Sequence, residues 1–478
     1  MGKNEKKTIT KQAVDFPAWY QDVVREAELA EVSEVRGCGI VRPYGLKIWE
    51  LIKAELSRQL EADGVENVYF PIFVPLENLE AEQDHVEGFA PELAVVTHAG
   101  GEELTNKLAI RPTSEAAMYK TYAKWIQSYK DLPLRLNQWA NVVRWEKRPR
   151  AFLRWSEFLW QEGHTVFANE TEARAEVEKM LSIYQSLYQF LAIPTFTGRK
   201  SESEKFAGAV MTLTAEVMAR DGKAIQGATS HYLGTNFAKV FNVTYLGADG
   251  ETHFGHQNSW GLSWRSVGAL IMVHGDDNGL RLPPNIAPVQ VVIVPIYKDD
   301  ATKSEVLAYC SDLNQSLSKQ YRVKTDVRDA QTPGFKFNYW EVRGVPVRLE
   351  VGAREAAAKK VTLFRRDTDT KEEVDLDHLP ERLQQLMVEI HDNLYQQAKA
   401  LADQNIHRIE SWDEIEGQTG WFEASWSEDP LTEKQLKEKY GLVSRVLLST
   451  QEEVAPKNSK CFISGKPAKH DWLFAKCY

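Results

Sequence analysis

The chain has 478 residues, of which 43% are hydrophobic, and a formal net charge of -10. This length is enough for two or three packed domains, and the acidic balance excludes a general nucleic-acid coat while leaving room for a local basic face. We find no run of 18 apolar residues and no apolar N-terminal segment, so we expect neither a membrane span nor a secretory signal. The four scattered cysteines, Cys38, Cys310, Cys461 and Cys477, favour a reducing compartment, and we expect a cytoplasmic protein.

A helix and a proline-bearing extended segment are predicted near the N-terminus. Residues 16–29 are predicted to be helical. After glycine and proline turn signals, apolar residues recur at helical spacing and residues 67–75 follow as an extended segment; the apolar residues are Trp49, Ile52, Leu56 and Leu60. Because proline cannot donate a hydrogen bond within a sheet, Pro71 and Pro75 place the segment at a sheet edge or end. It is either part of a subunit interface or an ordinary edge strand.

The segment EELTNKLAIRPTSE (residues 102–115) ends in Thr113, Ser114 and Glu115, just before a predicted helix with Met118 and Tyr122 on one face. Short hydroxyls and a carboxylate are typical of a helix cap. The same groups can receive an ammonium or imino nitrogen. The residues alone favour capping and leave binding as the alternative.

The stretch VVRWEKRPRAFLRWSEFLWQEGHT (residues 142–165) mixes arginines with aromatic and acidic residues. Its arginines, Arg144, Arg148, Arg150 and Arg154, flank the rings of Trp145, Phe152 and Trp155. An arginine fork beside an aromatic face suits a ligand that carries both phosphates and a base, such as ATP. The alternative is a solvated, charged strand pair with aromatic anchors, which charge and tryptophan alone favour.

Three polar clusters follow a long helix that is predicted to begin at Asn169 and Glu172. The first, bounded by glycines, contains Gln226, Thr229, Ser230 and His231, and glycines beside short polar side chains let backbone approach a ligand closely. His253 and His256 are spaced three apart without further metal ligands, so we predict no metal there. In NSWGLSWRSVGALIMV, Arg265 opens a buried helix and can pair with a carboxylate or a phosphate.

In combination these segments resemble the prolyl-tRNA synthetases, among the class II aminoacyl-tRNA synthetases, in their archaeal and eukaryotic-like form. The resemblance covers nearly the whole chain. The family's first motif matches residues 39–75, its second matches VRWE through FLWQEGHT, and its third matches NSWGLSWR. RPTSE, QGATSHYLG and HGDDNGLRLPP are further matches to the prolyl branch.

The resemblance implies proline activation by ATP and transfer of the prolyl group to tRNA(Pro), with Mg²⁺ on the phosphates. It implies Arg144 and Arg265 as catalytic residues. ATP-binding residues would be Arg144, Glu146, Arg154, Trp155, Gln226, Thr229, Ser263 and Arg265. Proline-binding residues would be Thr113, Glu115, Arg144, Trp160, Glu162 and His231.

A second domain is predicted after the linker PPNIAP. Short strands near residues 289–296, 321–327, 345–351 and 360–364 alternate with helical segments, so this domain is α/β. Residues 328–366 contain nine Lys or Arg against four Asp or Glu, which is typical of an RNA face. By resemblance this is the anticodon-binding domain, with Lys336, Glu341, Arg348 and Arg354 as the candidates for anticodon contact. For any single one of them, a solvated charged surface is an equal alternative.

A small third region follows a predicted helix that carries leucines from Leu379 to Leu401. Relatives often have four zinc-binding cysteines here, but the matching positions in this chain are Ser427, Thr432, Cys461 and Ser464. One thiol does not make a tetrahedral zinc site, so we expect no zinc. The terminal Tyr478 matches the family, whose final carboxylate turns back toward the catalytic domain; a free tail is the alternative.

The resemblance therefore implies an α/β protein in three domains. These are an α+β catalytic domain on an antiparallel sheet (1–282), an α/β anticodon-binding domain (283–400) and a small α+β C-terminal domain (401–478). Arg144 and Arg265 are 265 − 144 = 121 residues apart, so the bacterial-type editing insertion is expected to be absent. We expect a homodimer that binds tRNA(Pro) and L-proline, and neither membrane nor DNA. The alternatives are an inactive, synthetase-like RNA-binding or regulatory protein and a class II enzyme for another small amino acid.

Overall fold

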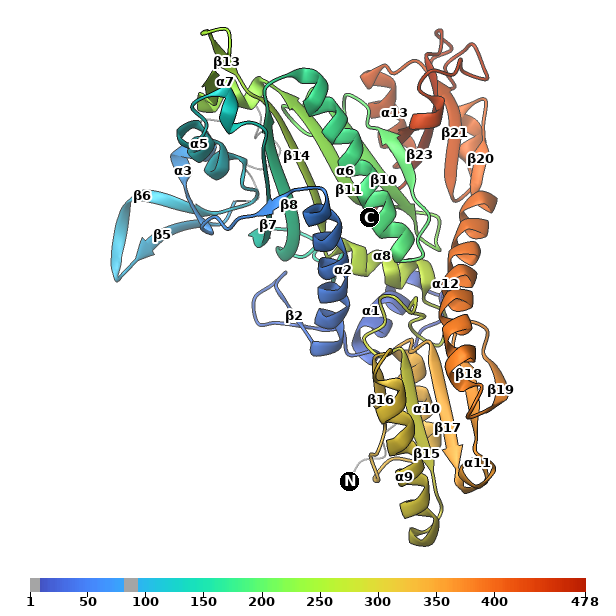
Figure 1. Ribbon diagram of the computed structural model, residues 1–478. Helices are drawn as coiled ribbons and strands as arrows, with labels where there is room; N and C mark the ends of the chain where they lie inside the picture. Colours follow the sequence, from blue (N-terminus) through green and yellow to red (C-terminus); the bar gives the residue numbers. More distant parts are fainter. Residues whose placement is uncertain (1–8, 81–92) are drawn as a thin grey trace.

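The computed structural model describes residues 9–80 and 93–478, and a long sheet runs through it (Figure 1). Eleven strands form this sheet, in the order β20 (Ile406–Arg408), β21 (Trp421–Trp426), β23 (His470–Ala475), β22 (Val443–Leu448), β9 (Phe196–Arg199), β10 (Met211–Met218), β11 (Ala224–Gly234), β14 (His256–Ser263), β8 (Glu157–Phe167), β7 (Leu134–Val143) and β3 (Glu66–Asn67). Neighbours from β21 to β7 are antiparallel. The predicted antiparallel sheet is confirmed.

Helix α6 (Glu170–Phe190) packs along β10, β11 and β14, and α2 (Pro43–Ala62) packs on α6 (Figure 1). The predicted start of α6 is confirmed, because the side chain of Asn169 accepts a hydrogen bond from the Glu172 amide at 2.9 Å. Its buried face carries Val177, Met180, Tyr184 and Leu187 at helical spacing. Helices α1 (Phe16–Glu26) and α8 (Arg265–His274) join the same core.

The extended segment predicted for residues 67–75 is wrong as a single strand. β3 ends at Asn67 in the large sheet, and β4 (Phe73–Pro75) lies in a separate three-stranded sheet beside β6 (Glu102–Ile110), which also pairs with β5 (Val95–Ala99). Between them the Phe70 amide donates to the Gln138 side chain at 2.5 Å. Pro71, which has no amide hydrogen, falls in this break.

Shorter elements complete this part of the chain. They are β1 (Ala30–Val32), β2 (Gly39–Val41), α3 (Leu76–Glu80), α5 (Glu115–Trp125), η2 (Tyr129–Asp131), α7 (Asn236–Phe241), β12 (Thr244–Leu246) and β13 (Thr252–Phe254). α5 packs on α7 and α3. Within residues 9–80 and 93–478, no helix combines the length and the apolar character that crossing a membrane requires.

The predicted α/β unit is confirmed as a five-stranded sheet. Its strand order is β16 (Val323–Thr325), β15 (Val291–Ile296), β17 (Val347–Gly352), β18 (Lys360–Arg365) and β19 (Thr370–Asp375). β15 pairs in parallel with both β16 and β17, and α9 (Asp300–Leu317) and α10 (Pro333–Val342) pack on it, with α11 (Ala353–Ala358) against α9. The sequence analysis did not predict β19, whose residues are mostly charged and exposed.

Helix α12 (Leu379–Gln404), also predicted, runs from this unit to the C-terminal part (Figure 1). That part adds η3 (Trp412–Ile415), α13 (Pro430–Tyr440) and η4 (Ser449–Gln451) to its four strands. Its strand β22 pairs with β9, with Leu447 opposite Arg199. The C-terminal region therefore extends the large sheet instead of forming a separate one.

Part of the basic excess in residues 328–366 holds the α/β unit against the N-terminal part of the chain. Arg366, which is 1% exposed, donates two hydrogen bonds to the Asp276 carboxylate at 2.8 and 2.6 Å. Arg343 is buried and donates to Glu28. These two cations face the interior of the protein, so local charge overestimated the basic surface open to RNA.

Candidate functional site

Polar side chains from neighbouring strands share one face of the large sheet. Because successive residues of a strand point to opposite faces, Trp160, Glu162 and His164 on β8 lie on the same side. The register continues this row of polar residues across the sheet, since His164 lies opposite Ser259 and Ser259 lies opposite His231. On the next strand, β10, Thr212 and Glu216 lie opposite His231 and Gln226 of β11.

Two cavities open above this face. The first, of about 280 Å³, contains the predicted residues Thr113, Glu115, Arg144, Trp160, Glu162, Gln226, Thr229, His231, Ser263 and Arg265 in its lining. The second, of about 310 Å³, contains Arg144, Glu146, Arg154, Trp155, Ser263 and Arg265. Arg144, Ser263 and Arg265 line both cavities. The fold therefore brings every residue predicted for ATP or proline into two adjoining spaces.

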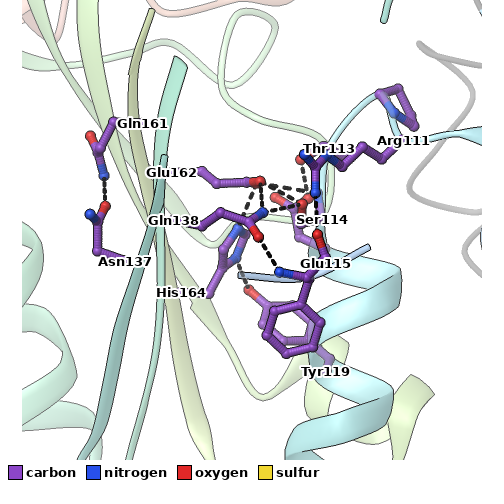
Figure 2. A network of polar contacts seen from close by, with 12 residues as sticks. Arg111, Thr113, Ser114, Glu115, Tyr119, Asn137, Gln138, Gln161, Glu162 and His164 are labelled. Atoms are coloured by element: carbon purple, nitrogen blue, oxygen red, sulfur yellow. Dashed lines mark hydrogen bonds and ion pairs between the residues drawn. The ribbon is translucent and has the colours of Figure 1, made fainter. Parts of the chain in front are cut away.

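A buried network surrounds the carboxylate of Glu162 at one end of the first cavity (Figure 2). It accepts hydrogen bonds from the Ser114 amide at 3.2 Å and the Ser114 hydroxyl at 2.5 Å. The Gln138 amide donates at 2.9 Å, and His164 Nε2 lies 3.0 Å away. Every lone-pair direction of this carboxylate thus has a partner, which fixes its position.

Charge in this network is set by burial and by opposite neighbours. Burial alone would raise the pKa of Glu162, but the partner His164 and the donors Ser114 and Gln138 outweigh it and lower the pKa. Burial alone would lower the pKa of His164, but Glu162 and the nearby charge of Glu115 outweigh it and raise the pKa. The lowered pKa keeps Glu162 a carboxylate, and this negative charge at the end of the cavity suits a cationic ligand.

Capping does not explain Thr113 and Ser114. Ser114 occupies the N-cap position of α5, yet its side chain makes no capping hydrogen bond and donates to Glu162 instead. Thr113 donates to Glu115, and both are buried. Glu115, Glu162 and His164 place ligand atoms within 4.8 Å of one another. Thr113 and Ser114 therefore donate to carboxylates that line the cavity, and the capping interpretation is wrong.

Arg144 is held between backbone and aromatic rings where the two cavities meet. Its Nε donates to the Pro112 carbonyl at 3.0 Å, and its guanidinium lies 5.3 Å from the Trp160 ring centroid and 5.6 Å from that of Phe158. The sequence analysis instead expected the arginines of this stretch to flank the rings of Trp145, Phe152 and Trp155. Phe152 and Trp155 pack on Trp264 in the core, while Trp145 is half exposed.

Arg265 is the first residue of α8, and it lines both cavities. Its Nε donates to the Leu153 carbonyl at 3.2 Å. Burial, reinforced by the positive charge of Arg154, lowers the pKa of Arg265, so an anion bound beside the two arginines would favour their charged forms. On the opposite side, burial lowers the pKa of His231 to about 3, so this imidazole is neutral, and its Nδ1 lies 2.9 Å from the Thr212 hydroxyl.

Comparison with known proteins identifies this arrangement. The family described as "tRNA synthetase class II core domain (G, H, P, S and T)" matches residues 97–274, "Anticodon binding domain" matches 290–386, and "Prolyl-tRNA synthetase, C-terminal" matches 410–478. The chain is 46% identical over 483 residues to "Proline--tRNA ligase 2" of a Bacillus cereus strain, with 100% of both chains covered. The chain belongs to the prolyl-tRNA synthetases.

Two further relatives agree. "Proline--tRNA ligase" of Chloroherpeton thalassium is 46% identical over 480 residues, which cover 98% of this chain and 99% of that protein. The crystal structure of prolyl-tRNA synthetase from Cryptosporidium parvum, complexed with halofuginone and AMPPNP, superimposes with a TM-score of 0.94 at 40% identity, covering 98% of this chain and 99% of that one. This synthetase attaches proline to tRNA, and none of these findings supports the inactive alternative.

The four anticodon candidates of the synthetase occupy different environments. Lys336 is 2% exposed, and its ammonium donates to the Asp326 carbonyl at 3.0 Å. Arg348 is also buried, pairs with Glu350 at 3.0 Å, and lies between the rings of Phe337 and Phe364. Only the other two reach solvent, Glu341 in part and Arg354 extensively.

Ser114, Gln138, His164 and Lys200 belong to the synthetase's site but were not predicted. His164 follows Glu162 by two residues on β8, so strand alternation could have placed it on the same face. For Ser114 the sequence analysis favoured capping and left binding as the alternative. Gln138 and Lys200 lie 24 and 16 residues from Glu162 and Glu216, and only the strand pairing brings each pair together.

The C-terminal region contains the four positions that match the zinc ligands of relatives. Cys461 is buried, and burial would raise the pKa of its thiol, but the hydroxyls of Ser427 and Ser464 lie against it and lower the pKa. Thr432 accepts a hydrogen bond from Trp426 Nε1 at 2.7 Å. Tyr478 is not a free tail, because its hydroxyl donates to Asp221 at 2.5 Å and its amide to the Ala224 carbonyl at 3.0 Å.

Proposed function

We propose that this synthetase forms prolyl-adenylate from L-proline and ATP in the two adjoining cavities and then transfers the prolyl group to tRNA(Pro). The observation that carries the assignment is the lining of both cavities by Arg144, Ser263 and Arg265. The proline carboxylate attacks the α-phosphate, pyrophosphate leaves, and a ribose hydroxyl of the tRNA end then attacks the acyl carbon and releases AMP. Such a reaction needs positioning and cationic stabilisation, without a protein nucleophile.

Proline is assigned to the first cavity. Thr113 and Glu115 receive the imino nitrogen, and Glu162 completes the negative charge that the cation neutralises. Trp160 and the neutral His231 enclose the ring. The close group of Glu115, Glu162 and His164 is assigned to the substrate cation, because hydrogen bonds already occupy Glu162.

ATP is assigned to the second cavity and its junction with the first. Arg144 contacts the meeting carboxylate and α-phosphate, and Arg265 holds the far phosphates, with Gln226, Thr229 and Ser263 beside them. Glu146 accepts from the adenine amino group, and Arg154 and Trp155 border the base. The AMPPNP in the related Cryptosporidium parvum structure supports a nucleotide in this fold.

ATP enters as its magnesium complex. Among residues 9–80 and 93–478, the one group of three close metal ligands is Glu115, Glu162 and His164, which we assign to proline. Phosphate oxygens are preferred ligands of Mg²⁺, which keeps several bound waters and therefore needs few ligands from the protein. When bound, Mg²⁺ neutralises phosphate charge that Arg144 and Arg265 also face.

The C-terminal region is proposed to hold no zinc. Ser427, Thr432, Cys461 and Ser464 supply one thiol and three hydroxyls, which do not fit a tetrahedral zinc site. Three hydroxyls thus stand where relatives have thiolates, and the apolar cluster around the buried Cys461, which includes Trp426, Phe462 and Phe474, supports a region held together by packing. The three domains are proposed to span 1–282, 283–400 and 401–478, in line with the family matches at 97–274, 290–386 and 410–478.

In the anticodon-binding domain, we propose that Arg354 and Glu341 contact the anticodon directly. Lys336 and Arg348 are buried and are proposed to shape the face that those two residues occupy. The dimer is proposed to use the segment that leads into β4, where Tyr69 and the first residue of β4, Phe73, are 71% and 52% exposed. The synthetase is proposed to act in the cytoplasm. Because the editing insertion is expected to be absent, we propose that mischarged alanine is cleared elsewhere or tolerated.

Amino-acid-dependent exchange of pyrophosphate into ATP tests the central assignment. The assay is run with each standard amino acid, on the wild type and on Arg144→Ala. Exchange with L-proline that disappears in Arg144→Ala is expected. Exchange driven more strongly by another amino acid than by L-proline, or no exchange at all in folded protein, would refute the assignment.

A further inference from the structure

A chain of three buried charges links the C-terminal region to the substrate cavity. The Lys200 ammonium lies 2.8 Å from one oxygen of Glu216, and Arg445 lies 2.6 Å from the other. The side chains of Lys200, Glu216 and Arg445 are 1%, 0% and 4% exposed. Lys200 follows β9, Glu216 is on β10, and Arg445 comes from β22 of the C-terminal region.

Lys200 is the member of this chain that reaches the cavity. It lines the first cavity together with Gln226 and Arg265. Its ammonium lies 2.8 Å from Glu216, which is its one ion-pair partner among the described residues, so donor capacity of its three N–H groups is left over. Buried donors are rarely left without acceptors, so an acceptor is expected to arrive with a ligand.

The charge balance selects an anion. Burial alone would raise the pKa of Glu216, but Arg445 and Lys200 outweigh it and hold it at about 2. Glu216 is therefore a carboxylate at neutral pH and lies between Lys200 and Arg445. Burial lowers the pKa of Lys200, and Glu216 and Glu204, which also lines this cavity, oppose that shift. An anionic ligand would favour the charged form of Lys200 in the same way. Arg265 lies close enough to be affected by the charges of Glu216 and Arg445. Phosphate is the anionic group that substrates bring to this end of the cavity.

Arg445 is held firmly by its own region. Its neighbour Ser444 donates to Glu433 at 2.5 Å, and Ser201, next to Lys200, donates to the other oxygen of Glu433 at 3.1 Å. The pairing of β22 with β9 runs through the same place. The position of Arg445 is thus fixed against the strand end that carries Lys200.

We propose that Lys200 contacts a phosphate of the substrates during the reaction, and that Arg445 positions Lys200 by sharing Glu216 with it. This inference rests on the assignment of the cavity to proline, ATP and the tRNA end. The phosphate belongs either to ATP or to the acceptor end of tRNA. The C-terminal region then contributes to catalysis through a positioning residue that does not itself touch a substrate.

Two assays on Lys200→Gln distinguish the two phosphates. Proline-dependent pyrophosphate exchange needs no tRNA, whereas single-turnover transfer from preformed prolyl-adenylate does. Loss of one buried, charged donor is expected to lower the affected rate by about 10²-fold. A loss in exchange identifies the ATP phosphate, and a loss confined to transfer identifies the tRNA phosphate. Lys239→Gln, an exposed lysine on α7, is the matched control and is expected to keep both rates.

Arg445→Gln tests the positioning role. Without Arg445, Glu216 pairs with Lys200 alone and draws its ammonium away from the substrate, so the same step is expected to slow by about tenfold, with Arg445→Lys restoring it in part. A purely structural role would instead lower both steps and the melting temperature together, and that result would overturn the proposal. Should Lys200→Gln fail to fold, Arg445→Gln and Arg445→Lys carry the test.

Rates within twofold of wild type for folded Lys200→Gln would refute the phosphate contact. Normal rates for Arg445→Gln, beside a slow Lys200→Gln, would refute the role of the C-terminal region. A wild type without proline-dependent exchange would instead refute the proposed function, so the two failures are distinguishable.

Discussion

Replacing Glu162 by glutamine changes one atom of a buried carboxylate that accepts several hydrogen bonds. Ser114 donates twice and Gln138 once, and His164 lies at 3.0 Å. In Glu162→Gln the new NH₂ group faces donors on at least one side, and each buried polar group left unsatisfied costs about 1–3 kcal/mol. His164 also loses the partner that raises its pKa.

Those losses lower folding stability. The variant also removes the negative charge assigned to the substrate cation, and loss of one such charged partner is expected to lower kcat/KM for proline by about 10²-fold. Pyrophosphate exchange at varied proline and varied ATP measures the effect. The decrease is expected in the proline dependence, with KM for ATP nearly unchanged, because Glu162 lines only the first cavity.

Glu157→Gln is the matched control, since Glu157 lies on the same strand, is exposed, and lines neither cavity. It is expected to behave as wild type. A folded Glu162→Gln enzyme with proline kinetics within threefold of wild type would refute the reasoning, as would an equal loss in the two substrates' kinetics.

Three other predictions follow from buried charges and from the thiol. Arg366→Met leaves Asp276 without its bidentate partner and is expected to lower the free energy of unfolding in urea by about 3 kcal/mol. Lys399→Met, which removes an exposed ion pair, is the control and is expected to change nothing measurable. Additive effects of Arg366→Met and Asp276→Asn would contradict a direct ion pair. The pKa of Glu216 is lowered from 4.5 to about 2, so its contribution to the free energy of unfolding, ~3 kcal/mol, is present above pH 4.5 and lost as the pH falls toward 2. Over this pH range the melting temperature of Glu216→Gln should therefore fall less steeply than that of the wild type. Equal slopes would argue against the ion pairs. Metal analysis of the purified protein should find no zinc, with no effect of chelator on the melting temperature; one equivalent of zinc per chain would overturn the proposal that the C-terminal region holds no zinc.

The local sequence pattern was enough to predict those helices whose own residues show a cap or a helical repeat of apolar side chains. Helix α6 has its Asn169 cap and an apolar stripe, and α12 repeats leucine at helical spacing, so both could be predicted before any tertiary contact was known. The antiparallel sheet came from the resemblance. The division of residues 67–75 between two sheets could not be predicted, because pairing partners such as β7 and β6 lie far along the chain.

The sequence by itself determined the membership in the prolyl-tRNA synthetase family and the residues that line the cavities, because motif residues keep their order and chemistry along the chain. Tertiary structure decided which of their side chains meet. Ser114 turned from a predicted cap to a partner of Glu162, Arg366 from a predicted RNA face to Asp276, and Lys200 came to share Glu216 with Arg445. Each of these contacts joins residues distant in sequence, and a side chain's partner across such a distance is set by strand register and domain packing, which no local pattern records.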